Sequence, residues 1–467
     1  MKVNTQNLDL WTSLKEALKG TEVDYTSLPL EKAIFLLAVP MVLELFMESL
    51  FAIVDIYFVG SLGASAVAAV GLTETYLFLL YSFAIGLSMG VTAIVARRIG
   101  EKELEKAGTT SLQAILIGII FSIPFSIAGL FYSRELLSFM GADEKVLTEG
   151  SFYIQWALGG NVVIMLLFIL NAVFRGVGDP AIAMKVLWIS NGVNIILDPI
   201  LIYGFGFIPA LGLEGASIAT IIGRGIGVVS QMWVLFHGSQ HLQIVKKKFF
   251  LKIEIIYLII QTSIGGIAQV LIGTSSWIFI MRILAEFGSE VIAGATIALR
   301  IMMFTMLPAW GLSNAVATMV GQNLGAGNLE RAEKSVWITG FWNMGYLLFV
   351  AIIYFLFCEK LIGFFSSDAK VISIGSEWLK IVSYSYFVYA WWMVSAQAFN
   401  GAGDTMTPTK INLVFFWILQ IPLCYILGKY FELAQTGVFW GIFFTETSVG
   451  LFTLWLFSKG KWKEFKV

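Results

Sequence analysis

Long apolar stretches separated by short polar ones dominate this chain and define its predicted elements. A helix that crosses a bilayer needs roughly 20 mostly apolar residues, and stretches of that kind recur along the whole sequence. We therefore predict an all-α polytopic membrane protein. Its twelve transmembrane helices are expected near residues 33–58, 66–96, 108–132, 150–174, 181–204, 213–236, 255–283, 291–321, 333–357, 374–399, 407–430 and 435–457.

The same pattern occurs twice, at one fixed offset. The run Phe174–Asp179 recurs as Phe399–Asp404, and 399 − 174 gives an offset of 225 residues. The segment Leu87–Ala107 recurs at the same offset as Leu312–Ala332. A period this long indicates a duplicated membrane unit, because the repeats of a solenoid are much shorter. Such duplication is usual in secondary transporters, whose two halves rock about a central site.

The duplication predicts two pseudo-symmetric lobes of six helices each, in the same orientation. We divide the chain into an N-terminal tail at residues 1–32, a first lobe at 33–245, a basic linker at 246–254, a second lobe at 255–458 and a basic tail at 459–467. The N-terminal tail lacks the apolar core of a signal peptide. Within it, the spacing of apolar residues over Leu8–Lys19 predicts an amphipathic helix lying on the membrane surface.

Positive charges fall in alternate connections between the predicted spans. They include Arg97 and Arg98 after the second span, Lys246–Lys252 after the sixth, and Lys459–Lys466 after the twelfth. The opposite connections carry few basic residues. By the positive-inside rule, the basic connections and both termini are predicted to be cytoplasmic. We expect a multi-pass protein of the cytoplasmic (inner) membrane.

Composition agrees with a protein that faces lipid. Hydrophobic residues make up 58% of the chain and charged residues 13%, outside the range of ordinary soluble domains. The net charge of −1 gives no reason to expect a nucleic-acid partner. Cys358 and Cys424 both stand in apolar surroundings and are interpreted as packing residues. We expect small-molecule and membrane-lipid partners, no cofactor and a monomer.

The first predicted span carries three acidic residues. Glu44, Glu48 and Asp55 lie within roughly 40° of each other at about 100° per residue, so they share one helix face. An ionisable side chain in hydrocarbon costs about 3 kcal/mol on insertion scales, so each needs a reason to be retained. Pro40 precedes them and removes one backbone hydrogen bond, which predicts a bend or hinge.

A second polar set lies in the fifth and sixth spans. Asn194 and Asp198 are four residues apart and therefore share a face, and the Thr220 hydroxyl could complete an oxygen-rich cavity with them and Asp55. Carboxylates crowded in a low-dielectric space cannot all stay ionised alone, so at least one should hold a proton or a cation. Such oxygen ligands suit Na⁺ as well as H⁺.

These acids could also be structural partners of a nearby Arg or Asn. The repeat argues against that interpretation for the set as a whole, because a structural network should be preserved in both copies. At the offset of 225, Glu44, Glu48, Asp55, Asn194 and Asp198 are replaced by Gln269, Gly273, Ile280, Leu419 and Leu423. The acids therefore belong to the first lobe, where we expect the coupling ion to bind.

Several of these segments together resemble the multidrug and toxic compound extrusion (MATE) family. They are Asp55–Gly60, Asn194–Pro199, Gly215–Thr220 and the paired loops Arg175–Asp179 and Asn400–Asp404. The acids of the first lobe look most similar to the DinF-like branch rather than the NorM branch, which also uses acids of the second lobe. The resemblance implies a secondary active exporter of lipophilic or cationic compounds by antiport against H⁺ or Na⁺.

The resemblance also implies roles for particular residues. Asp55, Asn194, Asp198 and Thr220 match the family's cation or proton site, and Pro40 matches a proline that bends the first helix. Glu44 and Glu48 have no counterpart in the family's general pattern, so their supporting role rests on the helix face alone.

Three other patterns leave alternatives open. Both Gly-x-Gly-Asp loops, ending in Asp179 and Asp404, fit intramembrane aspartyl proteases, but they lie at span ends beside prolines, which favours turns. We therefore expect no enzyme. A flippase of a lipid-linked precursor is a second alternative, and it would require a more cationic cavity. Arg224, Arg282 and Arg300 lie within spans and either pair with acids such as Glu286 or Glu446 or snorkel.

Overall fold

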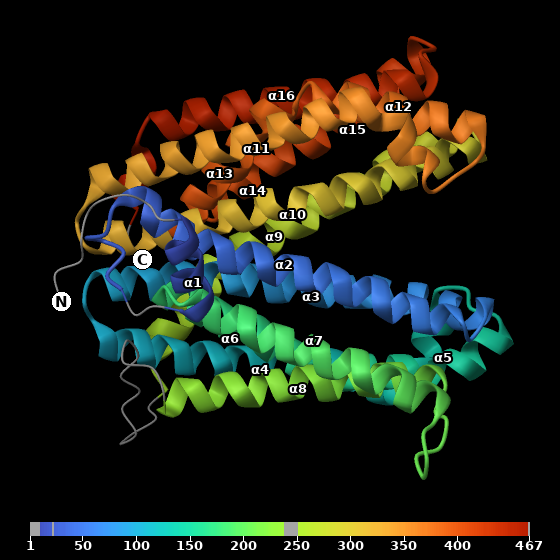
Figure 1. Cartoon of the computed structure of the whole chain (residues 1–467), viewed down its shortest axis with the longest axis horizontal. Coiled ribbons are helices and arrows are strands. Elements are labelled where there is room, and N and C mark those ends of the chain that lie inside the picture. The colour runs from blue at the N-terminus through green and yellow to red at the C-terminus, as the bar shows by residue number, and fades with distance from the viewer. Residues whose placement is uncertain (1–9, 21–22, 238–250, 466–467) are drawn as a thin grey trace.

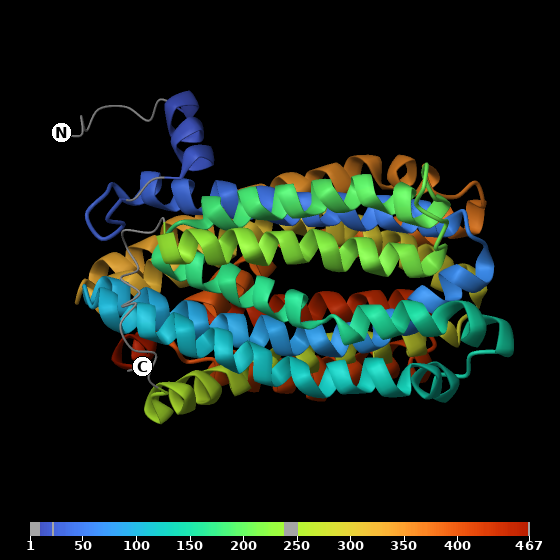
Figure 2. The same ribbon diagram turned by 90° about the horizontal axis from the view of Figure 1, so that it is seen from below.

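The computed structural model describes residues 10–20, 23–237 and 251–465, and all regular elements in these ranges are helical. Figures 1 and 2 show an elongated bundle, and in Figure 1 most helices of the two sequence halves form separate groups. Most of the predicted linker at 246–254 and the start of the predicted interfacial helix at Leu8–Lys19 lie outside the described residues. A short helix, α1, covers Leu10–Lys19.

The first lobe contains seven helices after α1. They are α2 (Leu30–Gly60), α3 (Ala64–Gly100), α4 (Leu104–Phe139), α5 (Glu144–Gly159), α6 (Val162–Val177), α7 (Pro180–Tyr203) and α8 (Leu213–His237).

The second lobe repeats this order, with one span divided further. Its elements are α9 (Ile253–Ala285), α10 (Ser289–Gly325), α11 (Leu329–Gly363), α12 (Ala369–Ser383), α13 (Tyr386–Ala402), α14 (Met406–Asn412), η1 (Leu413–Gln420), α15 (Ile421–Tyr425), η2 (Ile426–Tyr430) and α16 (Ala434–Ser458), followed by the short turn η3 (Lys461–Glu464).

These helices confirm the predicted all-α fold with twelve spans in two lobes. Eleven described segments are long and apolar enough to cross a membrane, with α5 and α6 counted as one segment. The pair α12 and α13 occupies the predicted span 374–399 and completes the twelve. Each expected span is therefore matched by a helix or by a pair of helices in line.

Two spans predicted as continuous helices are broken in the middle. The expected span 150–174 divides into α5 and α6 around Gly160, and the span 374–399 divides into α12 and α13 around Ser385. The positions correspond in the two copies, because 385 − 160 equals the repeat offset of 225. Apolar periodicity could not reveal these breaks, since the residues on both sides of each break remain apolar.

The eleventh span is continuous but irregular. After α14 it takes π-helical turns over η1 and η2, on either side of the short helix α15. Pro422 lies at the start of α15 and has no N–H to donate. A proline inside a helix also clashes with the carbonyl one turn earlier, and a wider turn relieves that clash.

The paired Gly-x-Gly-Asp loops form turns between helices. Gly178 and Gly403 adopt φ values of 96° and 93°, a left-handed conformation that favours glycine. Each turn ends one helix, α6 or α13, before the next helix begins. The Asp404 carboxylate accepts hydrogen bonds from the Thr407 N–H at 3.1 Å and the Thr407 hydroxyl at 2.6 Å. This geometry is that of a turn and helix cap.

The two lobes touch at one end of the bundle, which we call the basic end because Arg97 and Arg98 lie there. At Gly100, the last residue of α3, a Cβ atom would collide with the backbone carbonyl of Gln322 in α10. Nearer the middle of α3, Gly86 and Gly90 pack directly on Ile267 and Ser263 of α9. Glycine at these positions lets the central helices of the two lobes approach closely. Figure 1 shows α1 and the end of the chain at this same end.

Candidate functional site

The first acid of α2 forms a buried ion pair inside the first lobe. Glu44 Oε1 lies 2.5 Å from Arg175 Nη2 of α6 and accepts a hydrogen bond from Asn171 Nδ2 at 3.1 Å. The Asn171 side-chain oxygen in turn accepts from Gln231 Nε2 of α8 at 2.5 Å. The acid is 4% exposed, so its charge is neutralised by a partner rather than by water. The chain of contacts joins α2, α6 and α8.

The second acid of α2 has its own arginine. Glu48 Oε1 lies 2.8 Å from Arg224 Nη2 of α8, and Glu48 Oε2 accepts from Asn191 Nδ2 of α7 at 3.2 Å. Arg224 is 4% exposed and its guanidinium also lies over the Phe51 ring, 5.6 Å from the centroid. Glu48 and Arg224 therefore fix α2 to α7 and α8.

These contacts settle the partner of Arg224, which the sequence had left open. Arg224 pairs with Glu48 of its own lobe and with neither of the acids suggested from sequence. Glu286 pairs instead with Lys429, and Glu446 accepts a hydrogen bond from the Ser385 hydroxyl at 2.7 Å. The reason is tertiary: α8 packs against α7, whereas Glu286 and Glu446 belong to the other lobe.

The arginines that pair with Glu44 and Glu48 are, like these two acids, not repeated in the second lobe. At the offset of 225, Arg175 becomes Asn400 and Arg224 becomes Val449. Acid and base are thus both missing from the second copy. Glu44 and Glu48 are absent from the second lobe together with their arginine partners. Their absence therefore does not by itself indicate that the coupling ion binds at these two positions.

Three of the remaining candidate residues come together between α7 and α8. Asp198 is 0% exposed and Asn194 is 2% exposed. In the amide orientation that satisfies both neighbours, the Asn194 NH₂ donates to Asp198 Oδ2 at 2.9 Å, and its carbonyl oxygen accepts from the Thr220 N–H at 2.9 Å and hydroxyl at 3.2 Å. A buried carboxyl group is thus held by one amide, with no arginine or lysine paired to it among the described residues.

The fourth candidate, Asp55, faces this group from α2. It is half-buried and lies within electrostatic range of Asp198, of Glu74 in α3 and of Arg224. No ion pair holds its carboxylate among the described residues. The structure thus sorts the acids of α2 into two kinds: Glu44 and Glu48 are paired with arginines, and Asp55 is grouped with Asp198.

Pro40 lies in the part of α2 that packs against α10 of the second lobe. Before it, Ile34 and Leu37 pack in one cluster with Ala315 and Met319 of α10. After it, Val42 still packs on Gly311 of α10, while the two ion pairs bind the same part of α2 to the first lobe. The helix runs unbroken through Pro40 in this structure, and the missing backbone hydrogen bond makes this the easiest place for α2 to bend. A movement of one lobe relative to the other would therefore bend α2 most easily at Pro40.

The segment before α2 is also attached to the second lobe. Arg331 Nη2 of α11 donates to the backbone carbonyl of Tyr25 at 3.0 Å and to that of Leu28. Tyr25 is 3% exposed, and its ring lies close to Gly178 in the turn after α6. The chain ahead of α2 therefore contacts both lobes at the basic end.

One membrane-embedded acid was missed by the sequence interpretation. Glu74 lies on α3 inside the predicted span 66–96, exposed and within electrostatic range of Asp55. Glu446 of α16, which the sequence suggested only as a partner for an arginine, is 3% exposed and forms no ion pair among the described residues. The expectation that intramembrane acids belong to the first lobe alone is therefore wrong. The signal for Glu74 is a single acid inside an apolar span.

The described residues contain no group of three or more His, Cys, Asp or Glu side chains arranged to hold a metal ion. Asn194 directs its NH₂ toward Asp198, so the amide does not present an oxygen to that carboxyl group.

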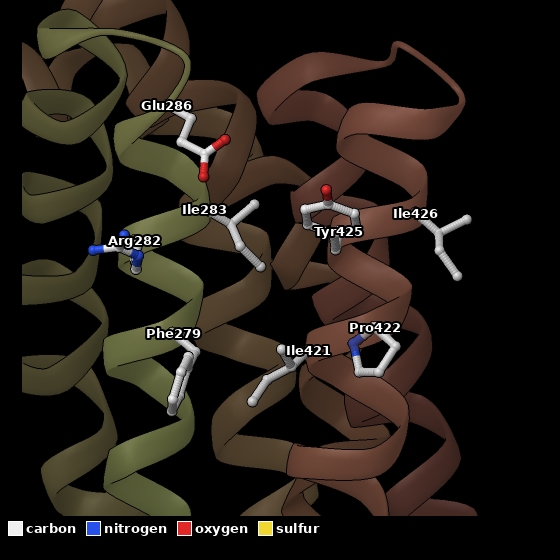
Figure 3. A pocket seen from close by; sticks show the side chains of 8 residues that line it. All are labelled: Phe279, Arg282, Ile283, Glu286, Ile421, Pro422, Tyr425 and Ile426. Atoms are coloured by element: carbon white, nitrogen blue, oxygen red, sulfur yellow. The ribbon is translucent and has the colours of Figure 1, made fainter.

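A separate pocket of about 470 Å³ lies in the second lobe, between α9 and the eleventh span. Figure 3 shows Phe279 and Arg282 of α9, and Glu286 just after it, across from Pro422 and Tyr425 of α15. None of the candidate residues of the first lobe lines it. The pocket is mostly apolar and stands apart from the acidic group.

Comparison with known proteins gives a consistent result. The MatE family model matches residues 40–200 and again residues 266–426, and 266 − 40 gives 226, close to the internal repeat. A Thermotoga maritima protein named "Probable multidrug resistance protein NorM" is 27% identical over 442 residues, covering 93% of this chain and 94% of that protein. A Shewanella oneidensis protein named "FAD transporter" is 25% identical over 415 residues, covering 87% of this chain and 90% of that protein.

The fold is also found among solved structures. A structure described as the outward-facing conformation of a multidrug resistance MATE family transporter superposes with a TM-score of 0.88 at 24% identity. The match covers 96% of this chain and 99% of that one. At this level of identity the likeness establishes the two-lobed fold.

Proposed function

We propose a function for this chain, which belongs to the MatE family of multidrug efflux transporters. It exports lipophilic organic cations by antiport with H⁺. Asp55 and Asp198 would carry the coupling proton, held in place by Asn194 and Thr220. The observation that carries the proposal is the sorting of charges in the first lobe. Glu44 and Glu48 each form an ion pair with an arginine, whereas Asp55 and Asp198 lie within electrostatic range of each other and neither forms an ion pair among the described residues.

Neutralisation of Asp55 or Asp198 connects to the hinge of α2. Two carboxylates that repel each other in a poorly solvated space favour a structure that separates them or a proton that neutralises one. Asp55 lies on α2 and Asp198 on α7, so their repulsion acts between these helices. Binding of one proton removes the repulsion, and α2 can then change its angle at Pro40. This is the step by which the coupling ion would change access to the cavity.

The remaining charge of the cavity favours a cationic substrate. With Glu44 and Glu48 neutralised by Arg175 and Arg224, the first lobe retains the negative charges of Asp55, Asp198 and Glu74. One relative is named an FAD transporter, and FAD is an anion, so family membership alone does not set the sign of the substrate charge. The flippase alternative needs free cationic residues, whereas Arg175 and Arg224 of the first lobe are each paired with an acid.

The proposed orientation in the membrane follows from the positions of the basic residues. We place the basic end in the cytoplasm, with both termini there, in the inner membrane. Lobes that touch at the basic end correspond to a state that is closed toward the cytoplasm. The transporter is proposed to work as a monomer, since the two lobes within one chain supply both sides of the cavity.

The test is transport of a lipophilic cation by the full-length protein in proteoliposomes, with pH and sodium gradients imposed separately. We expect a pH gradient to drive transport, and Asp55→Asn and Asp198→Asn each to abolish the response to it. Asp143→Asn serves as the matched control, because Asp143 only caps α5 outside the acidic group. Full coupling in both Asn variants would remove the site assignment. Transport driven by sodium alone would replace H⁺ with Na⁺.

A further inference from the structure

One charged residue of each lobe lies outside the proposed coupling group of Asp55, Asn194, Asp198 and Thr220. Glu74 of α3 and Arg300 of α10 both lie within predicted spans, and both side chains are exposed. Neither forms an ion pair within 4.0 Å among the described residues. The repeat does not preserve either charge, since Glu74 corresponds to Leu299 and Arg300 to Thr75 at the offset of 225.

The two residues lie at matching depths. Helices α3 and α10 begin at Ala64 and Ser289, which are equivalent in the repeat because 289 − 64 equals 225. Glu74 is 10 residues and Arg300 is 11 residues from these starts, or roughly 15 and 17 Å along the helix axis. Each helix has 37 residues, about 55 Å, and so extends well beyond a hydrocarbon core of about 30 Å. Glu74 and Arg300 therefore both lie in the half of their helix that is farther from the basic end.

The pair faces across the space between the lobes. Arg300 is the cationic group within electrostatic range of Glu74, although it belongs to the other lobe. One turn farther along α10, Phe304 meets Phe46 of α2 at 5.8 Å between ring centroids, so the lobes approach each other just below the pair. Farther along α2, Ile53 and Tyr57 are exposed.

We propose that Glu74 and Arg300 form the ion pair that closes the cavity at the end opposite the basic end. In the present structure the lobes touch at the basic end, and the two opposite charges stand apart. Rocking that separates the basic ends brings α3 and α10 together at the other end, where the charges are at the same depth. The contact then stabilises the closed mouth, and charges drawn away from water are matched instead of being left alone.

The proposal rests on alternating access of the two lobes, as in the proposed function, but its test depends on neither substrate nor coupling ion. Spin labels at Ala64→Cys and Ser289→Cys report the separation of the lobes at the mouth by pulsed electron paramagnetic resonance. Both positions are exposed, whereas the native Cys358 and Cys424 are buried. The full-length labelled protein in nanodiscs is examined across a range of pH.

Charge reversal supplies the variants. Glu74→Arg and Arg300→Glu should each reduce the ratio of closed to open mouth by about tenfold or more, because like charges then meet on closure. The double variant Glu74→Arg with Arg300→Glu should restore the ratio. The neutral variants Glu74→Gln and Arg300→Gln provide the same comparison with smaller effects if a reversed charge impairs folding.

The control is an ion pair of the same type within one lobe. Arg134 and Glu144 form a salt bridge inside the first lobe, so reversing either charge should leave the mouth distance unchanged. Single variants without effect, or a double variant no better than the singles, would overturn the proposal. If the labels show only one distance under every condition in the unsubstituted background, alternating access itself fails, and that outcome is distinct from failure of this ion pair.

Discussion

The side chain and the main chain of Arg175 contact different parts of the transporter. Its guanidinium lies 2.5 Å from the Glu44 carboxylate of α2, and its backbone carbonyl accepts a hydrogen bond at 2.9 Å from the Thr318 hydroxyl of α10 in the other lobe. The ion pair with Glu44 and a hydrogen bond between the lobes are therefore made by the same residue, Arg175.

The Glu44 and Arg175 pair should show strong coupling in thermal unfolding. Glu44→Gln leaves the buried part of the Arg175 charge without its partner, and we expect a loss of about 3 kcal/mol in unfolding free energy. Adding Arg175→Asn should recover most of that loss, because the double variant has the residues that the second lobe carries at Gln269 and Asn400. Equal and additive losses from the two changes would show that the pair contributes no coupling energy.

Close packing of α3 on α10 should be sensitive to a single methyl group. Gly100→Ala places a Cβ against the backbone carbonyl of Gln322, which cannot move aside as a side chain would. We expect the basic ends of the lobes to separate, which would be seen as faster labelling of a cysteine at Ala96 and as a fall in transport. Gly71→Ala on the same helix has open space around it and should change neither measurement.

The hinge role of Pro40 predicts that stability and rate change in opposite directions. Pro40→Ala restores a backbone donor inside α2, which should raise thermal stability and lower the transport rate several-fold. Pro124→Ala in α4 is the matched control, since Pro124 is an exposed proline inside a helix that does not link the lobes. Similar transport by the two variants would argue that α2 moves without bending at Pro40.

The segment ahead of α2 should loosen when its anchor is removed. Arg331→Gln loses the guanidinium that donates to the carbonyls of Tyr25 and Leu28. We expect faster hydrogen exchange over residues 23–29, measured by mass spectrometry, with little change elsewhere. Lys334→Gln on the same helix removes an exposed charge paired with Glu330 and should leave exchange there unaltered. Unchanged exchange in Arg331→Gln would show that packing of Tyr25 alone holds the segment.

Much of the architecture was predictable because it depends on local composition. Each span is an apolar stretch long enough to cross a bilayer, and the turns at Gly178 and Gly403 are placed by glycines that tolerate positive φ. The breaks at Gly160 and Ser385 do not show in the length of the apolar spans, although Gly159, Gly160 and Asn161 at the first break are residues that end helices. The candidate residues Asn194 and Asp198 were paired correctly because a spacing of four residues fixes a shared helix face.

The sequence by itself determined the two-lobed, twelve-span build and the one-lobe distribution of Glu44, Glu48, Asp55 and Asp198, because hydrophobic length, the repeat offset and helix periodicity are all properties of neighbouring residues. Only the tertiary structure decided which acids are paired. Glu44 and Glu48 share a helix face with Asp55, yet Arg175 and Arg224 reach only the first two. An ion pair depends on where another helix packs, and the packing of helices far apart in the chain is set by the fold as a whole.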